Sequence, residues 1–189
     1  MKAGRISVAV VVFGIALQLG NPSLTPGIVD GQLTIETRGV TFITGRPLDR
    51  LRDGGSVTYT FRIVVSTERR GRSLGSREHQ FVLSYDLWEE RFAVAELGTP
   101  TRSVSNLTSE EAEAWCLNNL ALPIGGIREN TPLWLRLEYR AVFEDTTLEG
   151  DENPGFGLGG LISIFSRREE NEVPEGMVET GPFRLSDLR

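Results

Sequence analysis

Apolar and polar side chains alternate along two long stretches of the chain. Residues 57–65 read VTYTFRIVV and residues 133–143 read LWLRLEYRAVF. Because successive side chains of a β-strand point to opposite faces, this period of two predicts strands with one buried face. Shorter runs that predict further strands lie at 33–37, continued by 40–43, and at 81–85, 92–94 and 183–185.

These strands predict a mainly β fold. One-sided alternation is typical of antiparallel sheets, because parallel sheets bury both faces and show continuous apolar runs. We therefore expect an antiparallel β-sandwich, immunoglobulin-like or C2-like, of about 6–8 strands. It would form a single domain over residues 28–189, with a basic loop at 67–75 and a loose glycine-rich and charged segment at about 149–180.

One amphipathic helix is predicted within this domain, at about 109–121 (SEEAEAWCLNNLA). Thr108 precedes it and Glu111 follows three residues later, which is the pattern of a capping box. Pro123 ends it. The residues that share one face at helical spacing are Ala112, Trp115, Cys116 and Leu120.

The first 22 residues predict a signal peptide or an N-terminal membrane anchor. Lys2 and Arg5 precede an uncharged run from Ile6 to Leu19. This run is shorter than the roughly 20 residues of a transmembrane helix and is typical of the hydrophobic part of a secretory signal. We expect an exported protein, either periplasmic or membrane-anchored and facing the periplasm.

Composition excludes several classes of function. A net charge of −6 disfavours binding to nucleic acid, which needs a basic face. One cysteine and one histidine can form neither an internal disulfide nor a structural zinc site. The GFGLGG at 155–160 lacks the lysine of a phosphate loop, and the acidic loop at 145–153 lacks the spacing of a strong calcium motif. We expect no cofactor, metal or nucleotide.

Few residues suggest catalysis. Asp86, Glu89 and Glu90 can be read as paired carboxylates for glycoside chemistry. Because they are neighbours between two predicted strands, a solvated hairpin loop of about 4–5 residues is the favoured interpretation. His79 is expected to be an ordinary surface residue, and Cys116 a buried thiol of the core.

A candidate interaction surface is indicated by exposed aromatic, arginine and apolar residues. Tryptophan, tyrosine and arginine are the types enriched at interface hot spots. The segment 158–165 has apolar residues at helical spacing and is followed by two arginines, so it is either core or a face for a membrane or partner. The candidate residues are Tyr85, Trp88, Arg91, Trp134, Leu158, Leu161, Ile162 and Phe165.

The order of these features, from about residue 45 to 145, resembles domain of unknown function 4390, a family of exported bacterial proteins. The residues that carry the resemblance are Val57/Tyr59/Phe61, Leu83/Tyr85/Asp86 with Phe92/Val94, and Ser109/Glu110/Glu111/Ala112 with Pro123. The family's tryptophan-containing terminal strand is not evident here. The resemblance implies export and a β-rich domain, and no established activity or catalytic residue.

The favoured function is therefore a non-enzymatic envelope protein that acts as an interaction module for an unknown envelope protein or a membrane surface. One alternative is a carbohydrate-binding or hydrolytic protein that uses exposed tryptophans (Trp88, Trp134) and carboxylates. Another is docking to a membrane surface through residues 158–165.

Overall fold

The computed structural model describes residues 21–143 and 175–188, which form two antiparallel sheets and two short α-helices. The small sheet has the strand order β1-β2-β7, with bounds Ser23–Val29, Gln32–Arg38 and Ala121–Pro123. The large sheet has the order β6-β5-β4-β3-β8-β9, with bounds Arg102–Leu107, Arg91–Leu97, Ser73–Asp86, Val57–Ser66, Leu133–Phe143 and Gly176–Phe183. The prediction of a mainly β, antiparallel fold is confirmed.

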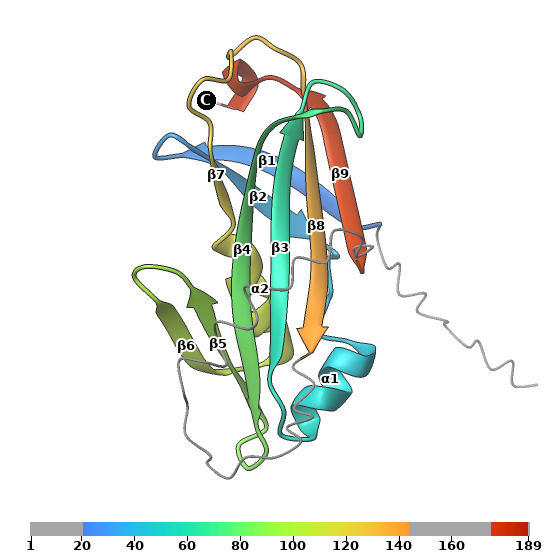
Figure 1. The fold of residues 1–189 in the computed structure, drawn as a ribbon, viewed down its shortest axis with the longest axis vertical. Coiled ribbons are helices and arrows are strands. Elements are labelled where there is room, and N and C mark those ends of the chain that lie inside the picture. Colours follow the sequence, from blue (N-terminus) through green and yellow to red (C-terminus); the bar gives the residue numbers. More distant parts are fainter. Residues whose placement is uncertain (1–20, 144–174, 189) are drawn as a thin grey trace, which may run out of the picture.

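One apolar core joins the two sheets. The inner face of the large sheet contributes alternate residues of β3 and β8, and the small sheet contributes Leu24, Leu33, Ile35 and Leu122. Figure 1 shows β1 and β2 running at a steep angle to the long strands of the large sheet, with α2 (Ser109–Asn118) beside them. Burial of apolar surface in this core is the main term that stabilises the fold.

The central strand β3 differs from its prediction, because both of its faces are buried rather than one. Thr58, Thr60 and Val64 are shielded together with the apolar residues of the inner face. β3 lies between β4 and β8, and the register places Arg140 and Arg136 of β8 beside Thr60 and Val64. Small side chains between long ones lose contact with water even on an outer face.

The helix α2 begins as predicted. The Thr108 hydroxyl accepts a hydrogen bond from Glu111 N at 3.2 Å, and the Glu111 carboxylate accepts one from Thr108 N at 2.8 Å. The hydrogen bond from Thr108 N to the carboxylate, followed by the contribution of the Thr108 side chain, lowers the pKa of Glu111. The helix ends at Asn118 rather than at 121, because Ala121 already belongs to β7. Cys116 is buried, as predicted.

A second helix, α1 (Gly45–Arg52), was not predicted. Residues 40–43, expected to continue a strand, form an irregular segment before it. This segment still buries apolar side chains, and the Phe42 ring lies 4.7 Å from the ring of Tyr59 and 4.9 Å from that of Phe61. The sequence pattern therefore identified the burial of residues 40–43 but not their backbone conformation.

The C-terminal part corrects two further expectations. Residues 176–180, placed in a loose segment, belong to β9 at the edge of the large sheet. Leu185, expected in a last strand, lies in a 3-10 helix, η1 (Leu185–Leu188). Residues 1–20 of the predicted signal or anchor (residues 1–22) lie outside the described residues, and so does the apolar segment 158–165.

Among the described residues, none of the helices has the length and apolar character needed to cross a membrane.

Candidate functional site

The hairpin between β4 and β5 forms as predicted, with the four-residue turn 87–90. Asp86 holds this turn, because its Oδ1 accepts hydrogen bonds from Trp88 N at 2.8 Å and Glu89 N at 3.0 Å. The same two bonds lower the pKa of Asp86, since they stabilise its charged form. Asp86 therefore shapes the turn, which agrees with the interpretation of a solvated hairpin loop.

Trp88 stands out on this turn, because 96% of its surface is exposed. Its neighbour Leu87 is also exposed, at 55%. Tyr85 is half-buried and packs on Phe92 with ring centroids 4.8 Å apart. Arg91 is exposed and donates to the Glu90 carbonyl at 3.1 Å. The structure thus brings Tyr85, Trp88 and Arg91 to one end of the hairpin.

Trp134 does not belong to this group. It pairs with Ser66 of β3, which in turn pairs with Ser73 at the start of β4, whereas the hairpin turn follows the end of β4. β4 has 14 residues, a length of about 45 Å. Trp134 is half-buried, with the Arg69 guanidinium 5.7 Å from its ring centroid. Trp88 and Trp134 therefore lie at opposite ends of the large sheet and form no common platform.

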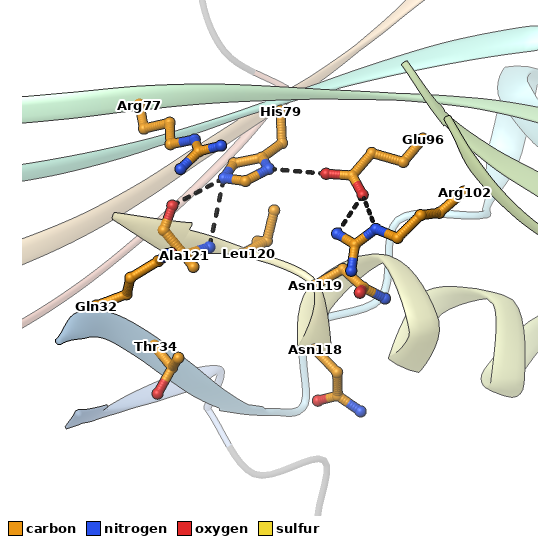
Figure 2. A pocket seen from close by; sticks show the side chains of 10 residues that line it. All are labelled: Gln32, Thr34, Arg77, His79, Glu96, Arg102, Asn118, Asn119, Leu120 and Ala121. Atoms are coloured by element: carbon orange, nitrogen blue, oxygen red, sulfur yellow. Dashed lines mark hydrogen bonds and ion pairs between the residues drawn. The ribbon is translucent and has the colours of Figure 1, made fainter. Parts of the chain in front are cut away.

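A polar pocket of about 330 Å³ lies where the small sheet approaches β4, β5 and β6. Figure 2 shows the side chains that surround it, which come from both sheets and from the end of α2. The lining residues are Gln32, Thr34, Arg77, His79, Glu96, Arg102, Asn118, Asn119, Leu120 and Ala121.

His79 lies at the centre of this pocket. The prediction that it is an ordinary surface residue is wrong, because its side chain is buried. Only 6% of its surface is exposed. Its Nδ1 lies 3.2 Å from Glu96 Oε1, and its Nε2 lies 2.9 Å from the Ala121 carbonyl oxygen and 3.3 Å from the Ala121 nitrogen. Ala121 is on β7, an edge strand whose outer main-chain groups would otherwise lack partners. His79 therefore provides a hydrogen-bond partner for the main chain at this edge.

Two protonation states of His79 fit this geometry. Because an ionised carboxylate only accepts hydrogen bonds, Nδ1 carries a proton toward Glu96 in both states. A neutral ring then accepts from the Ala121 N–H through Nε2, and a protonated ring donates from Nε2 to the Ala121 carbonyl. Glu96 is fixed from the other side by Arg102, whose Nε donates to Oε2 at 2.9 Å and whose second guanidinium nitrogen also pairs with Oε2.

Among the described residues, His79 and Cys116 do not form a nucleophile–base pair. His79 Nε2 already contacts the main chain of Ala121, so it is not available to deprotonate a substrate or water. Cys116 does not line the pocket, and burial raises the pKa of its thiol, which keeps it in the unreactive protonated form. Within the described residues, no group of three or more His, Cys, Asp or Glu is placed to hold a metal ion.

The phase of β4 is the signal in the sequence that could have revealed this site. His79, Phe81 and Leu83 occupy alternate positions, so His79 shares the inner face with two buried residues. Because His79 lies between two polar residues, the sequence does not show clearly that it belongs to the inner face of β4. Its partners Glu96 and Ala121 are 17 and 42 residues away, which no local pattern can indicate.

The comparisons with known proteins add no relative: no family model, curated protein or solved structure matches the chain.

Proposed function

We propose that the protein is an exported, non-enzymatic envelope protein that binds a protein partner through the tip of the β4–β5 hairpin. The observation that carries this proposal is the exposure of Trp88, at 96%, on a turn held by two hydrogen bonds to Asp86. A fixed backbone presents the indole with little loss of conformational entropy on binding. Tryptophan is also one of the residue types enriched at interface hot spots.

The charges around the tip indicate the chemistry of the partner. Asp86, Glu89 and Glu90 surround Trp88, and Arg91 is the one basic residue of the turn and its two flanking positions. An apolar pocket with a basic rim complements this surface. An anionic membrane surface does not, because three carboxylates would be repelled. The carbohydrate-binding and hydrolytic alternative receives no support from the tryptophans, since Trp88 and Trp134 lie at opposite ends of the large sheet.

Site-specific photo-crosslinking tests the hairpin. A photoreactive phenylalanine analogue at position 88, in cells that produce the protein, is expected to give one discrete adduct that a second exposed substitution, Leu87→Asp, removes. The matched control is the same analogue at Leu74, which is 51% exposed at the opposite end of β4. Equal adducts at both positions, or none at 88, would refute the proposal.

The proposal also includes export to the periplasm, the resemblance to a family of exported bacterial proteins, and the type of β-sandwich. Export to the periplasm is supported by the pattern of residues 1–22 and is tested by fractionation with and without this segment. The resemblance to domain of unknown function 4390 stays a prediction. An immunoglobulin- or C2-like sandwich is supported by two antiparallel sheets that share one core. An experimental structure with the sheets separated would refute that fold type.

A further inference from the structure

We propose that the polar pocket beside His79 binds a small oxyanion, a carboxylate or a phosphate group, between Arg77 and Arg102. This inference is independent of the hairpin, because the pocket and the tip of the turn share no residue.

The balance of donors and acceptors in the pocket carries the proposal. Glu96 is the one acid of the lining, and both of its oxygens are engaged, Oε1 by His79 and Oε2 by Arg102. Arg77 lines the pocket without an ion-pair or hydrogen-bond partner among the described residues. The lining therefore holds two guanidinium groups against one neutralised carboxylate, and this excess of positive charge and N–H donors matches an anion.

The amide side chains extend the same complementarity. Gln32 and Asn118 line the pocket beside the hydroxyl of Thr34, and each can donate a hydrogen bond. Asn119 is oriented by a hydrogen bond from its Nδ2 to the Trp115 carbonyl at 2.7 Å. Figure 2 shows Gln32, Thr34 and Asn118 on the side of the pocket opposite to Arg77 and His79, and Asn119 beside Arg102. A bound anion would therefore meet polar hydrogen-bonding groups on two sides.

The carboxyl end of α2 is the one feature that opposes an anion, because helix C-termini carry a partial negative charge. Its carbonyls are largely satisfied. The Trp115 oxygen accepts from Asn119 Nδ2, the Cys116 oxygen from Asn119 N, and the Leu117 oxygen from Leu120 N. A capped partial charge of this kind is weaker than the full charge of Arg77, so the pocket still favours an anion.

The size and rigidity of the pocket limit the ligand. A volume of about 330 Å³ is at the lower end of ligand sites and corresponds to about ten water molecules. His79, Glu96 and Ala121 connect three strands of two sheets, so the wall behind the ligand is formed before binding. The pocket therefore fits a small acid or a phosphate group.

Titration of the full-length protein followed by ¹H–¹⁵N NMR tests this site. The probes are sodium succinate and sodium phosphate, each compared with sodium chloride at the same ionic strength. We expect saturable shifts of the side-chain amides of Gln32, Asn118 and Asn119 with one or both probes. Saturation with succinate alone assigns a carboxylate ligand, and saturation with phosphate alone assigns a phosphate group.

Two variants make the test specific. Arg77→Gln is expected to weaken binding by about tenfold or more, the loss of one charge-assisted contact. Asn118→Asp places a negative charge in the lining and should weaken binding as well. Arg62→Gln removes an exposed arginine on β3 that does not line the pocket, and it should bind like the wild type. Shifts that never saturate, that chloride reproduces or that Arg77→Gln leaves unchanged would overturn the proposal.

Discussion

Replacing the buried carboxylate of Glu113 is expected to destabilise the protein strongly. Glu113 is on α2 with 7% of its surface exposed, and its Oε1 accepts hydrogen bonds from Phe42 N and Ile43 N, each at 2.7 Å. Glu113→Ala leaves both buried N–H groups without a partner, at about 1–3 kcal/mol each. Water that enters the vacated space recovers part of this loss, so we expect a decrease of about 3 kcal/mol in the free energy of unfolding.

Two matched variants separate the hydrogen bonds from the charge. Glu113→Gln keeps an oxygen acceptor of the same reach and loses only the charge assistance, so we expect a cost of about 1 kcal/mol. Glu110→Ala removes an exposed acid from the first turn of the same helix and should cost less than about 1 kcal/mol. Comparable costs for the Ala and Gln variants of Glu113 would show that the two hydrogen bonds are not what stabilises the segment.

Urea unfolding followed by tryptophan fluorescence measures these differences, with the slope of the transition checked for constancy. Hydrogen exchange gives a local reading of the same contact. The amides of Phe42 and Ile43 should be protected in the wild type and in Glu113→Gln, and they should exchange much faster in Glu113→Ala. A Glu113→Ala protein within 0.5 kcal/mol of the wild type, with both amides still protected, would refute the reasoning; this threshold is about the scatter of ordinary surface substitutions.

Three further predictions follow from perturbed pKa values. Burial raises the pKa of the Cys116 thiol, so a thiol reagent such as DTNB should react only after unfolding in urea, and reaction in the folded protein would contradict the core placement. Burial also raises the pKa of Tyr59, whose hydroxyl donates to the Phe42 carbonyl at 2.8 Å. A raised pKa means that stability is complete below the ordinary value of 10.0 and is lost as pH rises above it. Tyr59→Phe should reduce this alkaline loss, measured by thermal melts at increasing pH, and should cost about 1 kcal/mol at neutral pH, the loss of one hydrogen bond, because the Phe42 carbonyl still accepts from Thr44 N. Backbone hydrogen bonds lower the pKa of Asp86, so its contribution is present above the ordinary value of 3.8 and is lost as pH falls below it. Asp86→Asn should therefore melt with a smaller dependence on pH in this acidic range, and an unchanged dependence would contradict the turn geometry.

The strands that the sequence predicts are those in which one face dominates the pattern. β8 alternates without interruption from Leu133 to Leu137, and the alternation of β3 is visible although its second face is buried too. In contrast, α1 reads GRPLDRLR and β9 reads GMVETGPF. Glycine and proline are typical of turns and loops, so the sequences of both elements predict loops. Their conformation depends on neighbours, because β9 pairs with β8 and α1 packs beside β3 and β4.

The candidate site was only partly predictable for a related reason. The hairpin at Trp88 is local, since its strands and its turn lie within one short stretch of sequence. The pocket depends on contacts between distant strands, and its central residue lies in a polar run. Glu113 illustrates the same limit, because the amides it binds are 71 and 70 residues away in the sequence. A buried polar residue is identified by its partners, and those partners become neighbours only in the folded protein.

Glu113 and His79 meet the same physical need in different ways, and the difference separates a structural contact from a candidate binding site. Each satisfies main-chain groups of a segment that has no further strand beside it, the irregular segment at 40–43 for Glu113 and the edge of β7 for His79. Glu113 accepts both of its hydrogen bonds from buried main-chain amides. At His79 the network of Glu96, Arg102 and Ala121 is already complete, and Arg77 and the amide side chains are additional to it. Polar groups beyond those that the fold needs are the reason to expect a ligand at His79 and none at Glu113.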